Sequence, residues 1–175
     1  MKDIQLTNYQ LISYYLPGQL FVFCFFITYQ QVNSIDKLIT SLKDLNIAFG
    51  VVSIIFSFLI GLIFDAIRNG FIEKIFKLIE KKKPKTDKIN WDFFYTGDIK
   101  DVGVFYGRYF TYYCFDFNLI ISLFISIIML DSCGSLKYKL IFTLVSIGSI
   151  ISLLSDGLVL RSDMAKATNY KNPKP

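Results

Sequence analysis

Hydrophobic positions along the chain gather into four long uncharged runs, and the charged residues lie in blocks between them. The runs lie near residues 11–29, 47–67, 112–130 and 140–160. Each approaches the roughly 20 apolar residues that a helix needs to cross a bilayer. We therefore expect an all-α integral membrane protein with four transmembrane helices, folded as a single membrane domain over residues 1–175.

The first run differs from a cleavable signal peptide. Its front carries Asp3 beside Lys2, its core contains Pro17, and no small-x-small cleavage site follows. We expect it to be a retained helix that is kinked at Pro17-Gly18, where neighbouring helices satisfy the freed backbone groups.

The connection between the first two runs predicts a short amphipathic helix. Within residues 32–45 the apolar side chains recur at helical spacing, with Asp36, Lys37 and Lys43 off that face. Such a helix closes the first hairpin.

The connection between the second and third runs, residues 68–111, is 44 residues long. A helix–helix connection usually needs only about 2–8. Its first part, RNGFIEKIFKLIEKKK, keeps apolar residues on one face and lysines on another. We expect a basic amphipathic helix on the cytoplasmic side, lying in the headgroup layer and followed by a solvated turn at Pro84.

The distribution of basic residues predicts the orientation. With four spans, fifteen of the nineteen Lys and Arg residues fall on one side and four on the other. Because the more basic side faces the cytoplasm, both termini and residues 68–111 should be cytoplasmic. The expected location is a bacterial inner membrane, crossed several times.

The third run is preceded by many aromatic residues, from Trp91 to Tyr113. One interpretation is an interfacial belt, because amphipathic rings prefer the headgroup level. The other is a stacking platform for a nucleotide or single-stranded nucleic acid. The belt requires no ligand and is favoured.

Polar residues also recur inside the runs. Small or polar side chains follow at steps of four, as in Ser53, Ser57, Gly61 and Asp65, and comparable stripes lie on the third and fourth runs. Close helix packing is the favoured reading, and a hydrophilic path is the alternative. At the cytoplasmic ends we expect an intramembrane polar layer, which consists of Asp65, Arg68, Asn118, Asp156 and Arg161.

The chain holds little conventional catalytic chemistry. It has no histidine, which removes Ser-His-Asp and Cys-His catalysis and histidine metal sites, and its three cysteines are scattered. Asp65 and Asp156 are the one pair that an intramembrane enzyme would use. We expect no enzyme activity, no cofactor and no metal site.

This plan of four spans, a basic aromatic cytoplasmic segment and no enzymatic residues resembles the membrane subunits of bacterial antiviral operons, most closely the Kiwa membrane subunit. It is also similar to the small pore-forming accessory protein of type VI CRISPR systems. The first resemblance implies an oligomer that works with a cytosolic partner as a sensor or scaffold, and the second implies a pore.

If the protein is a scaffold, its partner or lipid surface lies in the basic segment. The residues that we expect to carry that surface are Lys81, Lys82, Lys83, Lys85, Trp91 and Phe94. The expected partners are therefore membrane lipids, further copies of the chain and a cytosolic effector, with a nucleotide or nucleic acid as a weaker candidate.

Overall fold

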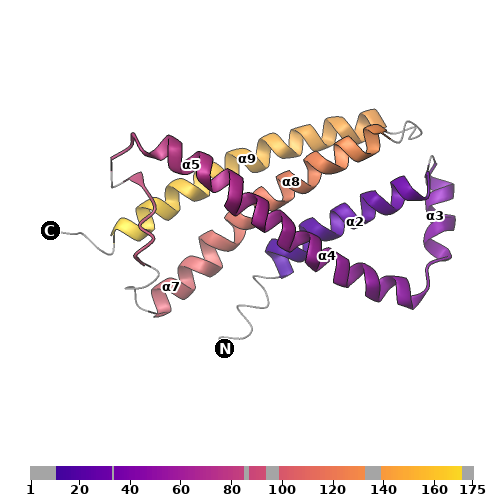
Figure 1. The fold of residues 1–175 in the computed structure, drawn as a ribbon, viewed down its shortest axis with the longest axis horizontal. Helices are drawn as coiled ribbons and strands as arrows, with labels where there is room; N and C mark the ends of the chain where they lie inside the picture. The colour runs from indigo at the N-terminus through magenta and orange to yellow at the C-terminus, as the bar shows by residue number, and fades with distance from the viewer. Residues whose placement is uncertain (1–10, 33, 85–86, 94–98, 133–138, 171–175) are drawn as a thin grey trace.

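The computed structural model describes residues 11–32, 34–84, 87–93, 99–132 and 139–170. All regular elements in these ranges are helices (Figure 1). Four helices are long and apolar enough to cross a membrane, namely Leu11–Tyr29, Ile47–Glu80, Thr111–Leu130 and Lys139–Asn169. The prediction of an all-helical chain with four potential spans is confirmed.

The elements follow one another as η1 (Leu11–Tyr15), α2 (Leu16–Tyr29), α3 (Ile35–Lys43), α4 (Ile47–Ile67), η2 (Arg68–Ile72), α5 (Glu73–Glu80), α7 (Ile99–Phe105), η4 (Tyr106–Phe110), α8 (Thr111–Ser132) and α9 (Lys139–Tyr170). The three η elements are π-helical turns, each joined directly to an α-helix. Such wider turns insert an extra residue into a helix and change which side chains face its neighbours.

The predicted short helix of the first connection is α3. The side chain of Ser34 caps it by accepting a hydrogen bond from the Lys37 N–H at 3.2 Å, and Asn46 caps α4 through the Phe49 N–H at 2.9 Å. The diverging ends of α2 and α4 are bridged by α3, so that the three helices form a triangle (Figure 1).

The predicted basic amphipathic helix, α5, is a direct continuation of α4. The backbone stays helical from Ile47 to Glu80 through the π-helical turn that contains Gly70. No proline interrupts this stretch, and the next one is Pro84. Residues 73–80 therefore extend the second long helix, in the direction indicated by the helical pattern that continues past Asp65 and Arg68 in the sequence.

The long helices pack at positions that lack a Cβ atom. A Cβ on Gly18 of α2 would overlap the Ser57 carbonyl of α4, and one on Gly61 of α4 would overlap the Tyr14 backbone. Ser57 Oγ also donates to Gln19 Oε1 at 2.8 Å. The stripe on the second run is thus used for close helix contact.

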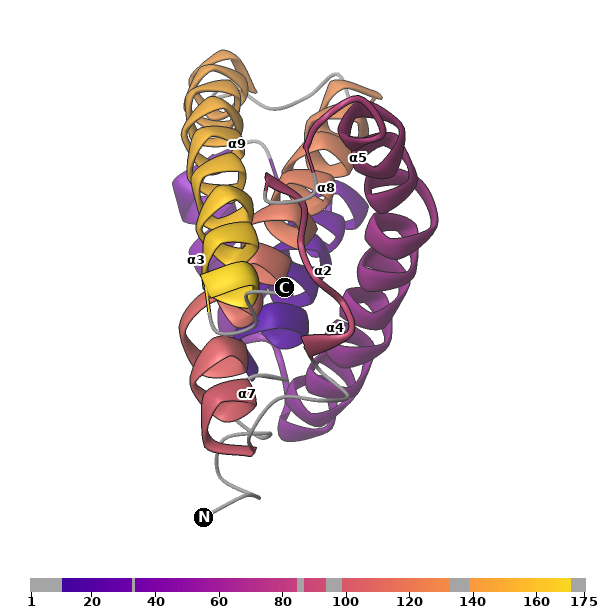
Figure 2. The same cartoon turned by 90° about the vertical axis from the view of Figure 1, so that its left-hand side faces the viewer.

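The largest group of buried apolar side chains lies at the α5 end of the molecule, which faces the viewer in Figure 2. It combines residues 89–93, α7, the start of α8 and the end of α9, and consists of Ile89, Phe93, Phe105, Tyr113, Cys114, Phe117, Met164 and Ala165. Several of the clustered aromatic residues are therefore core residues, which neither sequence interpretation anticipated.

Candidate functional site

The centre of the charged network is Glu73, the first residue of α5. Its carboxylate accepts hydrogen bonds from Arg161 Nη1 of α9 at 3.0 and 3.1 Å, and from Arg68 Nη1 at 3.4 Å. The hydroxyl of Tyr113 on α8 donates to the same carboxylate. One acidic side chain therefore joins three helices.

The network continues along α5 to Glu80. Arg161 Nε donates to Glu80 Oε1 at 2.7 Å, and Arg161 Nη2 donates to Glu80 Oε2 at 3.3 Å. Tyr113 closes the ring, because its hydroxyl accepts a hydrogen bond from Arg161 Nη1 at 2.8 Å. Arg161 is thus held between two turns of α5 and fixes α5 against α9.

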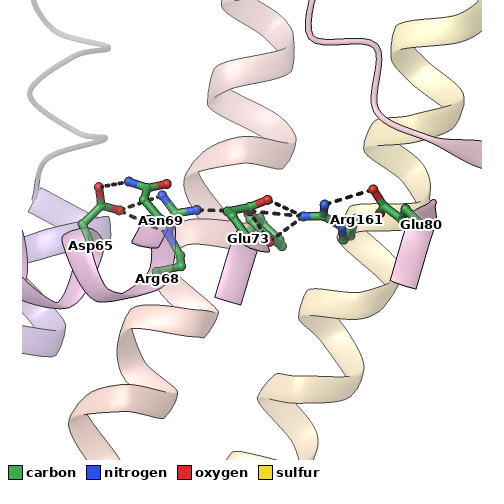
Figure 3. A network of polar contacts seen from close by, with 7 residues as sticks. Asp65, Arg68, Asn69, Glu73, Glu80 and Arg161 are labelled. Atoms are coloured by element: carbon green, nitrogen blue, oxygen red, sulfur yellow. Dashed lines mark hydrogen bonds and ion pairs between the residues drawn. The ribbon is translucent and has the colours of Figure 1, made fainter. Parts of the chain in front are cut away.

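At its other end the network reaches Asp65. Arg68 donates to Asp65 Oδ1 from Nη2 at 2.8 Å and from Nε at 3.2 Å, and Asn69 Nδ2 donates to Asp65 Oδ2 at 2.9 Å. Figure 3 shows the side chains in a row from Asp65 to Glu80. Five charged groups therefore form one continuous chain across the π-helical turn.

Because these charged groups are buried, losing any one of their contacts should cost stability. The side chains of Arg68, Glu73 and Arg161 are 2%, 8% and 5% exposed. Removing one partner of such a buried pair leaves an uncompensated charge, which costs about 3–5 kcal/mol. The Arg161 guanidinium also lies 4.3 Å from the centre of the Phe76 ring, a cation–π distance.

The structure joins Asp65, Arg68 and Arg161 of the five residues expected in the polar layer. Asn118 does not belong to this network. It lies on α8, where its Nδ2 donates to the Ser13 carbonyl at 2.8 Å. That carbonyl is four residues before Pro17, which has no N–H to offer it. Asn118 therefore supplies a donor where the backbone of the first helix lacks one.

Asp156 is also outside the network, and its side chain is exposed on α9. It precedes Arg161 by five residues, which places it about 140° around the helix from that side chain. The structure therefore joins neither Asn118 nor Asp156 to the charged network, although both had been expected in the same polar layer.

Sequence reasoning missed Glu73, Glu80 and Tyr113. Glu73, Phe76 and Glu80 are spaced i, i+3 and i+7, so they lie on one helical face. In the structure this face meets α8 and α9, whereas Phe71 and Ile79, expected on a common apolar face, are exposed. The two acidic residues at this spacing were the signal in the sequence that could have identified this face. They were overlooked because the apolar residues of the helix are more numerous and form a more obvious pattern.

The expected partner surface lies beside the network. Lys81, Lys82 and Lys83 are exposed after the end of α5, and Trp91 is 38% exposed. Lys85 and Phe94 lie outside the described residues. A pocket of about 290 Å³ separates α5 from α9 at this point, with Lys83 and Lys166 among the residues that line it.

In the described part of the chain, no group of three or more His, Cys, Asp or Glu side chains is arranged to hold a metal ion. The three carboxylates of the network are instead bonded to arginine. Comparison of the chain with protein-family models, curated proteins and solved structures finds no match.

Proposed function

We propose that the protein is a non-enzymatic, oligomeric inner-membrane scaffold or sensor of an antiphage defence system, and that it engages a cytosolic effector through the basic segment after the second span. The observation that supports this proposal most is the Glu73–Arg161 clamp. It fixes α5 to α9 beyond the uncharged apolar runs near residues 47–67 and 140–160.

The clamp gives the basic segment a defined surface. The exposed lysines of α5 and of the turn that follows it are Lys74, Lys77, Lys81, Lys82 and Lys83. Because α5 is held by buried contacts, its lysines are displayed on a fixed helix. A partner that binds a preorganised surface avoids the entropy cost of ordering it, so this arrangement suits protein recognition better than a solvated loop does.

The charge of the segment indicates the chemistry of the partner. Clustered lysines favour an acidic surface, which increases the rate of association and selects among partners. Exposed apolar side chains on the same helix, including Phe71 and Leu78, add area for a partner or for the membrane surface. The defence role itself is supported by the resemblance in overall plan to membrane subunits of antiviral operons.

A pore is the alternative, and one observation favours it. The polar side chains of the stripes on the second and third runs already take part in contacts between helices. Ser122 Oγ donates to the Pro17 carbonyl at 2.8 Å, and Ser57 bonds Gln19. The stripe on α9 differs, because Gly148, Ser152 and Asp156 are exposed. Only this stripe is available to line a path between copies.

The test of the scaffold is capture of its partner by chemical cross-linking in membranes, with a variant that carries Lys81→Gln, Lys82→Gln and Lys83→Gln. The control carries Lys43→Gln on the α3 side and keeps Lys37. We expect the triple variant to reach the membrane normally, lose the cross-linked partner and lose protection against phage, while the control keeps both.

Equal capture and equal protection by all three proteins would contradict the scaffold. Cation flux through liposomes that contain the purified wild-type protein, abolished by Ser152→Leu, would establish the pore instead. The two functions are therefore separated by different variants and different measurements.

A further inference from the structure

A groove of about 620 Å³ lies between α2 and α4, on the α3 side of their crossing. Its wall is formed almost entirely by aromatic and aliphatic side chains of the two helices, chiefly Phe21, Phe25 and Phe26 of α2 and Phe49, Val52 and Phe56 of α4. This volume lies within the usual range for ligand sites, about 300–1,000 Å³.

The groove follows from how the two helices cross. They touch backbone to backbone at Gly18 and Gly61, where neither residue has a side chain to separate them. From that crossing the helices diverge toward α3 (Figure 1). The small residues at one end therefore bring the helices together, and the aromatic residues at the other end line the space between them.

A smaller cavity, which α3 helps to line, adjoins the groove. This cavity of about 180 Å³ shares Val22, Phe26, Phe49 and Ser53 with the groove, and it also contacts Leu42 and Leu45. Apolar side chains of α3 and of the turn after it therefore lie beside the diverging helices, next to the groove.

The groove is open at its side. Phe25, Val52 and Phe56 line it and are 52%, 49% and 54% exposed. All three belong to helices that are long and apolar enough to cross a membrane, so the opening continues into the surface that would face lipid. An empty apolar groove forfeits dispersion contacts, and water does not fill it. Hydrocarbon chains are the apolar molecules that such a surface meets.

The residues that line the groove are uncharged, and α3 carries the charges that lie beside its edge at Gln30. Lys37 Nζ donates to the Gln31 carbonyl at 2.9 Å, next in sequence to Gln30, which lines the groove. Across α3 and the residue after it, Lys37 and Lys43 are matched by Asp36 and Asp44. A group with one positive and one negative charge complements this edge better than an anion does.

We infer that the groove binds one acyl chain of a zwitterionic phospholipid, whose headgroup lies beside α3 at Lys37. This site is independent of the proposed scaffold function, because it lies at the opposite end of the long helices from the Glu73 network. The lipid fills the triangle formed by α2, α3 and α4 and fixes the angle between α2 and α4.

The test is native mass spectrometry of the purified protein after incubation with equal amounts of phosphatidylethanolamine and phosphatidylglycerol. Val22→Trp and Ile60→Trp fill the groove from α2 and α4. Leu144→Trp places the same side chain on α9, where Leu144 is 61% exposed away from the groove. We expect wild type and Leu144→Trp to retain one phosphatidylethanolamine, and the groove variants to retain at least about tenfold less, because the indole ring occupies space in which the acyl chain would be buried.

A second measurement uses the wild-type protein alone, so that it does not depend on the folding of a variant. Phosphatidylethanolamine with a photoreactive acyl chain should label peptides from residues 21–30 and 49–60 more than peptides from α9. Labelling in proportion to exposed apolar surface would overturn the proposal. In the mass-spectrometry experiment, three results would also overturn the proposal. They are an adduct of phosphatidylglycerol, equal lipid retention by all variants, and a protein dimer that disappears when the groove is filled.

Discussion

At the scale of single residues, a polar side chain on one long apolar helix compensates for a backbone irregularity of another. Pro17 removes an N–H from the first helix, and Asn118 donates to the Ser13 carbonyl that such an N–H would reach. The Oδ1 atom of Asn118 has no hydrogen-bond partner and is buried. The position of this asparagine is therefore explained by one donated hydrogen bond.

Asn118→Leu should lower the free energy of unfolding by about 1 kcal/mol, the usual value of one hydrogen bond between membrane helices. The loss should be smaller in a Pro17→Ala background, because alanine restores the missing N–H. Unfolding in mixed detergent micelles measures all four proteins of this cycle. An equal loss in both backgrounds would mean that Asn118 does not act through the proline.

The glycines differ sharply in what surrounds them. Gly61→Ala should destabilise the protein by about 1–3 kcal/mol, since the added methyl group meets the Tyr14 backbone. Unlike a side chain, the backbone cannot avoid this contact by changing its rotamer. Gly50→Ala on the same helix is the matched control, because nothing lies within 4 Å of its Cβ position. Thermal unfolding should separate the two variants, and equal melting temperatures would contradict the close crossing.

At the scale of elements, α5 depends on the clamp to α9. Glu73→Gln and Arg161→Gln should each lower stability by about 3 kcal/mol, and the double variant should lose less than their sum, because neither member of this pair is left facing an uncharged partner. Glu80 loses its Arg161 partner in Arg161→Gln and in the double variant alike. Lys166→Gln is the control, since its pair with Asp163 is largely exposed and should contribute little. Strictly additive losses would show that Glu73 and Arg161 do not interact.

The elements were predictable where hydropathy alone determines them. Each of the four apolar runs lies in one of the long helices, although the second and fourth helices continue beyond their runs to Glu80 and Tyr170. The capping residues Ser34 and Asn46 mark helix starts that are visible in the sequence. The helical pattern that continues past Asp65 and Arg68 indicates that α5 follows α4, but it does not indicate the π-helical turn between them. A π-helical turn at residues 68–72 changes the face that α5 presents, and hydropathy does not report such a change.

The candidate site was predictable in part for a related reason. Asp65, Arg68 and Arg161 were found because charges beside an apolar run are conspicuous. Glu73 and Tyr113 were missed because the first was given no role beside the lysines of its helix and the second was assigned to an aromatic belt. Their roles depend on contacts between α5, α8 and α9, which no local pattern contains.

At the scale of the whole molecule, the two ends of the long helices differ. One end joins α5, α8 and α9 through charged hydrogen bonds and an aromatic core. The other end separates α2 from α4 beneath α3 and leaves an apolar groove. The first end suits a protein partner in water, and the second suits lipid. The proposed scaffold requires the first end to face the cytoplasm, so α3 at the other end of the long helices should lie on the opposite side of the membrane.

This orientation is the claim on which the account depends, and cysteine labelling tests it directly. Ala replaces Cys24, Cys114 and Cys133, and single cysteines then replace Lys83 beside the clamp or Lys37 on α3, both exposed. In intact spheroplasts an impermeant maleimide should label the cysteine at 37 and spare the one at 83 until the membrane is permeabilised. Labelling at 83 before permeabilisation, with protection at 37, would place the basic segment outside the cell and contradict the account.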